Sequence, residues 1–144
     1  MPINWRKIKT GVGNASHVPD AIKNLFSQDE KIREAAYWKL DNYVVIQSDL
    51  HEAAFYIIEP IVELLETPYS SDRLLALTIL IEVATGGNGN DLISINENSN
   101  IIQMNLDKAC QKKFKELKKR IAAIIVKTDA EKEELEFLLE SIES

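Results

Sequence analysis

Residues 74–84 constrain the fold more than any other segment, because they are apolar on almost every side of the helix that they predict. The stretch reads "LLALTILIEVA", and Glu82 is its one charged residue. A helix without a polar face has to be covered by other parts of the protein on several sides. We therefore expect this helix at the centre of a stack, with helices from earlier and later in the chain packed against it.

The preceding segment, residues 50–66, predicts an amphipathic helix although Pro60 lies inside it. At helical spacing its apolar side chains share one face: Ala53, Ala54, Ile57, Ile58, Ile61, Leu64 and Leu65. A proline inside a helix removes one backbone hydrogen bond and crowds the carbonyl of the preceding turn. Because Pro60 lies at the flank of the apolar face, we expect it to bend the helix around its neighbours.

Capping signals and hydrophobic periodicity predict six helices and almost no strands. The helices are expected over 19–27, 29–46, 50–66, 71–85, 105–127 and 129–143. Ser27 to Glu30 and Thr128 to Glu131 both have the form of a capping box, which begins a helix. Taken in twos, the helices make three antiparallel pairs of solenoid length, about 19–46, 50–85 and 105–143. We predict one all-α domain, an α-solenoid of the HEAT or armadillo-like kind, with a flexible N-terminus over 1–18 and a loop over 87–103.

No group of residues predicts an active site. His17 and His51 are the only histidines, and neither stands in the spacing of a metal-ligand motif. Cys110 lies on the apolar stripe of the helix expected over 105–127, so we interpret it as a packed structural thiol. As the single cysteine it cannot form an internal disulfide, which suits a reducing compartment. We therefore expect no catalytic residue, no metal and no cofactor.

The distribution of charge predicts a basic protein partner. Residues 40–104 carry 10 acidic residues and 1 basic residue, Arg73, whereas residues 105–127 carry 2 acidic and 8 basic residues. Nucleic-acid binding depends on clustered Lys and Arg, which the acidic block lacks. We interpret the lysines of 105–127 as a solvated helix face, or as neutralising carboxylates of the 129–143 helix. The alternative for the acidic block is that it serves solubility alone.

The expected partner-binding residues surround the turn between the first two helix pairs: Asp41, Tyr43, Asp49, Glu52, Tyr56, Glu59 and Glu63. The last four share one helix face at spacings of 4, 3 and 4. Carboxylates steer a basic partner and tyrosines anchor it. The loop over 87–103 is the alternative interface, and we expect Trp38 in the core. Without a secretory signal or a long apolar run, we expect a cytoplasmic protein that binds no nucleic acid and no membrane.

Three packing signatures together resemble a known group of proteins. They are Ala35-Ala36-Tyr37-Trp38, then Glu52-Ala53-Ala54 leading to Pro60, then Leu74-Leu75-Ala76-Leu77 leading to Gly86-Gly87. The chain is similar in these to the small bacterial HEAT-repeat proteins that act as immunity proteins in polymorphic toxin systems. The resemblance covers about residues 27–87 by motif and the last helix pair by pattern. The chain departs from it at Glu59, where we expect an aliphatic residue, and in its long Asn-rich connection.

The resemblance implies a non-enzymatic module that binds and neutralises a cognate toxin domain. A general scaffold or regulatory subunit that binds a peptide in the solenoid groove is the first alternative. A HEAT-like enzyme acting on nucleic acid is the second, and it requires a basic groove that this sequence does not predict. Fold alone does not decide between these functions.

Overall fold

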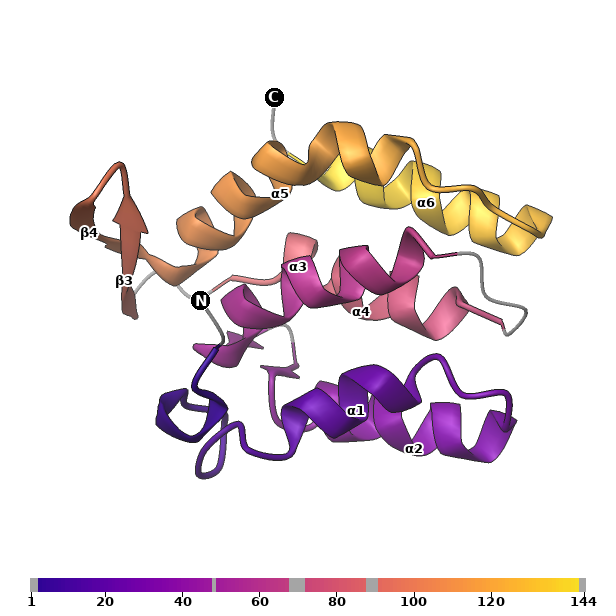
Figure 1. The fold of residues 1–144 in the computed structure, drawn as a ribbon, viewed down its shortest axis with the longest axis horizontal. Coiled ribbons are helices and arrows are strands. Elements are labelled where there is room, and N and C mark those ends of the chain that lie inside the picture. Colours follow the sequence, from indigo (N-terminus) through magenta and orange to yellow (C-terminus); the bar gives the residue numbers. More distant parts are fainter. Residues whose placement is uncertain (1–2, 48, 68–71, 88–90, 143–144) are drawn as a thin grey trace.

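The computed structural model describes residues 3–47, 49–67, 72–87 and 91–142 (Figure 1). Within them lie six α-helices: α1 (Val18–Asn24), α2 (Glu30–Asp41), α3 (Ala53–Leu65), α4 (Leu74–Thr85), α5 (Leu106–Ala122) and α6 (Asp129–Ser141). Two antiparallel pairs of strands accompany them: β1 (Val45–Ile46) with β2 (Asp49–Leu50), and β3 (Leu92–Glu97) with β4 (Asn100–Asn105). A 3-10 turn covers Trp5–Lys7. The fold is therefore mainly helical, with two small sheets.

The helices lie in three tiers of two, and α4 contacts helices of every tier. Figure 1 shows the first tier, α1 beside α2, the second, α3 beside α4, and the third, α5 beside α6. Helix α4 contacts α2, α3, α5 and α6, so its apolar sequence is covered from several sides as predicted. The side chains that it buries are Ala76, Leu77, Ile79, Leu80, Val83 and Ala84. They belong to one continuous core that includes residues of every helix.

The all-α prediction is wrong for the end of the second predicted helix, where β-branched residues form a strand. The second helix, predicted over 29–46, ends at Asp41. Val44, Val45 and Ile46 follow it, and such side chains favour extended backbone over helix. Val45 pairs with Leu50 across a turn in which Gln47 has a positive φ of 50°.

The prediction of a loop over 87–103 is wrong from residue 92 on, because the hairpin of β3 and β4 spans residues 92–105. Residues 88–90 lie outside the described residues. Asn98 and Ser99 link the strands with positive φ values of 52° and 68°, the backbone that a two-residue type I′ turn requires. Ile93 and Ile95 alternate with polar residues along β3, which is the pattern of a strand with one covered face. The strand signal is thus present in the sequence but hidden among residues typical of loops.

The N-terminal segment expected to be flexible over 1–18 is joined to the body by backbone hydrogen bonds. The N–H of Gly11 donates to the carbonyl of Tyr43 at 2.8 Å, and the N–H of Ala53 donates to the carbonyl of Lys9 at 3.0 Å. Ile8 and Ala15 are buried in the core. Residues 1–2 lie outside the described residues.

Several helix ends differ from their predicted positions: α1 ends at Asn24 and not at 27, and α3 begins at Ala53 and not at 50, where β2 lies instead. Helix α5 stops at Ala122 rather than at 127, because the β-branched run from Ile124 to Val126 disfavours helix. Ile125, which helical spacing would place on the same apolar stripe as Cys110, is 81% exposed. At the start of α2 the cap is Asp29, whose Oδ1 accepts from the N–H of Lys31, so the predicted capping box at Ser27 is displaced. The start of the fourth helix predicted at 71 and the end of the sixth at 143 lie outside the described residues.

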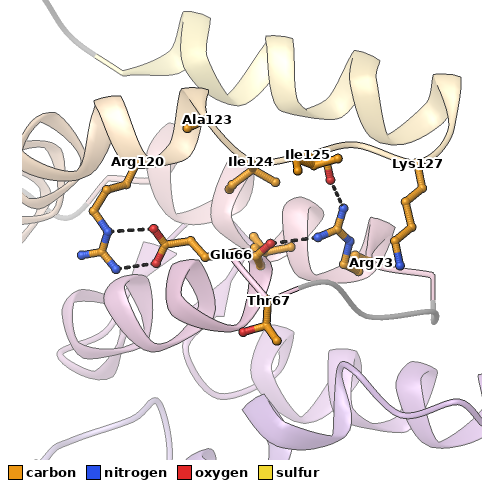
Figure 2. Close-up of a pocket in the computed structure, with 9 residues that line it drawn as sticks. Glu66, Thr67, Arg73, Arg120, Ala123, Ile124, Ile125 and Lys127 are labelled. Atoms are coloured by element: carbon orange, nitrogen blue, oxygen red, sulfur yellow. Dashed lines mark hydrogen bonds and ion pairs between the residues drawn. The ribbon is translucent and has the colours of Figure 1, made fainter.

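A buried ion pair between Arg73 and Glu131 joins the second and third tiers. Both side chains are 2% exposed, and Arg73 Nη2 lies 3.2 Å from Glu131 Oε1. The guanidinium also donates to the carbonyls of Leu65 and Ile125 (Figure 2). Glu131 accepts a further bond, of 3.0 Å, from the N–H of Lys127. The predicted cap at the start of α6 is present as well, since Thr128 Oγ1 accepts from the N–H of Glu131 at 3.1 Å.

We expect Glu131→Gln to reduce the free energy of unfolding by about 3–5 kcal/mol, because it leaves the buried Arg73 charge without its counter-ion. Urea denaturation measures the change. Glu133→Gln, an exposed position on the same helix, is the matched control and should change stability by less than about 0.5 kcal/mol. Equal, small effects of both substitutions would contradict a structural role for the pair.

The same pair predicts a loss of stability in acid. Burial opposes ionisation of Glu131, but hydrogen bonds from the backbone N–H groups of Lys127 and Arg73, together with the Arg73 charge, hold its pKa below the ordinary 4.5. A lowered pKa contributes stability above the ordinary pKa and loses it as the pH falls through the lowered value. The difference in unfolding free energy between wild type and Glu131→Gln should therefore shrink below pH 4.5. Denaturant titrations over this pH range check it.

Candidate functional site

An acidic hollow lies where the end of α2 meets α4. It has a volume of about 320 Å³ and is lined by Asp41, Val45, Gln47, Glu82 and Thr85. Asp41 is the last residue of α2, and Val45 and Gln47 come from β1 and the turn after it. The contact between α2 and α4 places Glu82, the single charge of the central helix, at this junction. Two carboxylates from segments distant in sequence therefore line one concave surface.

The carboxylates of the hollow are held close enough to affect each other. Tyr37 Oη donates to Glu82 Oε1 at 2.5 Å. Burial, together with a hydrogen bond to the neighbouring Asp41 carboxylate and its charge, raises the pKa of Glu82 to about 7, although the hydrogen bond from Tyr37 lowers it. Within the described residues no basic side chain forms an ion pair with either carboxylate. The hollow thus has a surplus of negative charge that the chain itself does not neutralise.

Trp38 lies on α2 about one turn before Asp41 and is exposed, which corrects the prediction that it belongs to the core. Its side chain is 55% exposed, and its ring meets Tyr37 edge-on with centroids 5.0 Å apart. Helix α2 buries Ala36 and Leu40 instead. Trp38 and Asp41 are three residues apart and therefore share a side of α2. An exposed tryptophan next to carboxylates is a typical anchor of a protein interface.

Of the seven residues expected to bind a partner, Asp41 alone lines the hollow. Tyr43 is half-buried, with its ring edge-on to His17 at 4.7 Å. Asp49 is exposed in β2. The remaining four, on or next to α3, are Glu52, Tyr56, Glu59 and Glu63.

The α3 stripe is largely occupied by contacts within the chain. Glu52 Oε1 accepts from the backbone N–H of Lys9 at 2.8 Å. Tyr56 is half-buried against Phe55, with ring centroids 5.1 Å apart. Glu59 lies 3.8 Å from Arg120 of α5, whereas Glu63 is exposed. The helix spacing was predicted correctly, but the partners that α5 and the N-terminal segment bring to it were not.

The basic residues of α5 neutralise α3 and β3 rather than α6. Arg120 pairs with Glu66 at 2.6 Å, and Lys112 pairs with Glu97 at 2.7 Å. In the described residues no ion pair joins α5 to α6, so that part of the sequence-based interpretation is wrong. Lys108, Lys115 and Lys119 are exposed, as a solvated face predicts.

A second hollow, of about 300 Å³, lies between the end of α3 and residues 123–127 (Figure 2). Figure 2 shows Arg120 directed at Glu66 on one side and Arg73 directed at backbone carbonyls on the other. Both guanidinium groups are thus engaged by the chain itself. We interpret this hollow as the joint between the second and third tiers, and not as the primary site.

The cysteine and the two histidines lie in surroundings typical of residues that pack within a fold. Cys110 is 1% exposed, and burial, with the Asp107 carboxylate, raises its thiol pKa to about 12. His17 meets Tyr43, and His51 is half-buried. The described part of the chain holds no group of three or more His, Cys, Asp or Glu side chains that could bind a metal ion. Among the described helices, none is both long enough and apolar enough to cross a membrane.

Comparisons of the chain with protein-family models, with curated proteins and with solved structures find no match. Inferences about function therefore rest on the residues and their geometry.

We expect Cys110 to react slowly with iodoacetamide in the native protein and at least about a hundredfold faster in denaturant, because the thiolate is the reacting species and burial suppresses it. Mass spectrometry of timed samples measures the rates. Fast labelling of the native protein would show that the thiol is accessible and would reopen a chemical role.

Proposed function

We propose that this protein is a non-enzymatic protein-binding module whose partner inserts a lysine or arginine side chain into the hollow between Asp41 and Glu82. The observation that carries the proposal is the pair of carboxylates in the hollow without a neutralising cation, with the exposed Trp38 about one helical turn from Asp41 on α2. The partner then presents a basic surface, in agreement with the acidic composition of residues 40–104.

The chemistry of the hollow suits a cation in three ways. A positive charge offsets the repulsion between Asp41 and Glu82 and favours the ionised form of Glu82. Charge-assisted hydrogen bonds to the two carboxylates are stronger than neutral ones. The face of Trp38 adds a cation–π contact worth about 0.5–2 kcal/mol. Catalysis has less support, because the one hydroxyl in the lining, that of Thr85, donates to the carbonyl of Ile81 at 2.8 Å and not to either carboxylate.

The partner that we propose is a toxin domain, which makes the protein a cytoplasmic immunity protein. The support is the resemblance of residues 27–87 to HEAT-repeat immunity proteins, together with the three tiers of paired helices that a short α-solenoid would have. The hairpin of β3 and β4 is an addition to such a solenoid. A scaffold that binds a basic peptide is the alternative, and it uses the same hollow.

The test is the affinity for the toxin domain encoded directly upstream of this gene, measured by isothermal titration calorimetry. We expect Trp38→Ala to raise the dissociation constant about thirtyfold or more, as loss of an aromatic anchor does, and Asp41→Asn to raise it as well. Phe137→Ala removes another half-exposed aromatic side chain, 51% exposed on α6, and should leave the affinity unchanged.

Binding should also release a proton, because a cation lowers the pKa of Glu82 from about 7. The affinity should then increase as the pH rises through 7, and the heat of binding should depend on the buffer.

If Trp38→Ala and Asp41→Asn bind as tightly as wild type, the interface lies elsewhere, and charge reversal of Glu59 with Glu63 tests the α3 stripe. If the upstream gene encodes no toxin, the immunity role fails and the scaffold role remains.

A further inference from the structure

Strand β4 forms a free edge at one end of the molecule (Figure 1). Its partner β3 packs one face on the body, since Ile93 is buried and Ile95 and Glu97 border a hollow shared with α3 and α5. On β4, by contrast, Ile101 is 78% exposed and Ile102 is 37% exposed, and Gln103 is exposed too. An edge strand of this kind presents backbone donors and acceptors to any chain that can pair with it.

The hairpin turn determines which backbone groups face outward. Because Asn98 and Ser99 form a two-residue turn, Glu97 and Asn100 are a hydrogen-bonded pair, and bonded and non-bonded pairs alternate from there. Ile101 and Gln103 fall in non-bonded pairs, so their N–H and C=O groups point away from β3. In the described part of the chain neither residue donates a backbone hydrogen bond to another element.

The features that normally protect a sheet edge are missing from β4. Exposed edges are usually blocked by charged side chains, by proline or by a bulge. The strand reads "NIIQMN", which has no charge and no proline. Its register with β3 runs from Leu92↔Asn105 to Glu97↔Asn100 without a break, so no bulge turns the edge aside.

We propose that two copies of this chain associate by antiparallel pairing of β4 with β4. With Ile102 on the two-fold axis, Ile101 of each copy exchanges both backbone hydrogen bonds with Gln103 of the other. The two hairpins then form one continuous sheet, with Ile102 facing Ile102 across the axis. An antiparallel edge is complementary to itself, as a two-fold contact between identical subunits requires.

Charge favours a second copy at this strand over the other exposed faces. The outward face of α5 carries lysines (Lys108, Lys115, Lys119) and the outward face of α6 carries glutamates (Glu133, Glu136, Glu140). Either face would repel its own copy across a two-fold axis. Strand β4 has no charged side chain, and the nearby Glu97 is paired with Lys112. Two chains of net charge −6 can therefore meet here without placing like charges together.

A contact of one strand pair buries less area than a permanent dimer needs, so the association is weak and reversible, with a dissociation constant on the order of 10⁻⁴ M. Sedimentation velocity from about 10 µM to about 1 mM spans this value. We expect the average mass to rise from that of the 16.3 kDa monomer toward twice that mass.

Gln103→Pro and Ser94→Pro form the matched pair of variants. Ser94 lies opposite Gln103 in the register, so each proline removes an outward N–H and no hydrogen bond within the hairpin. Gln103→Pro should weaken self-association at least tenfold, and Ser94→Pro should leave it unchanged. Should either variant fail to fold, hydrogen exchange of the wild type decides: the amides of Ile101 and Gln103 should exchange more slowly at high concentration, and those of Ser94 and Asn96 should not.

Three results would overturn the proposal. One is the mass of a monomer at all concentrations in the sedimentation experiment, which is expected if β4 pairs with a strand of a different protein. Another is self-association that Gln103→Pro and Ser94→Pro weaken equally. The third is concentration-dependent protection at Ser94 and Asn96, which would assign the contact to β3.

Discussion

The burial of α4 is the constraint on which the rest of the structure depends. A helix with almost no polar side chain is stable in water when other elements remove its whole surface from solvent. Four helices meet that need, two from earlier in the chain and two from later. The order of the tiers follows from this requirement, because α3 and α4 must lie between the other two pairs.

The two polar groups near α4 show what such burial demands. Arg73, just before the helix, is buried with a carboxylate and two carbonyls around it, so its charge is compensated. Glu82, near the end of the helix, has a tyrosine hydroxyl and another carboxylate beside it, and its pKa rises to about 7. The ion pair of Arg73 stabilises the fold. The two carboxylates at Glu82 repel each other, and a cationic ligand can relieve this repulsion. That contrast is why we place the binding site at Glu82 and not at Arg73.

The helices were predictable from the sequence because their signals lie within a few neighbouring residues. The candidate site was not predictable, since its residues lie far apart in the sequence. The apolar face of α3 and the cap at Thr128 follow from spacing alone. The hairpin was missed since its asparagines are typical of loops, although its isoleucines alternate. Tyr37 and Glu82 are 45 residues apart, so only the packing of α2 on α4 reveals that they meet. Trp38 was assigned to the core because a tryptophan on an apolar helix is usually well buried, but α2 buries Ala36 and Leu40 and leaves Trp38 exposed.

The position of Glu131 has a consequence for how the chain is made. Arg73 is synthesised 58 residues before the carboxylate that compensates it, and α6, which packs against α4, is the last of the six described helices. During translation the first four helices therefore leave the ribosome tunnel while one side of α4 is still exposed to water. At that stage the Arg73 guanidinium has no counter-ion. The nascent chain can form its early tiers, but it cannot complete the core around α4 until α6 has left the ribosome tunnel.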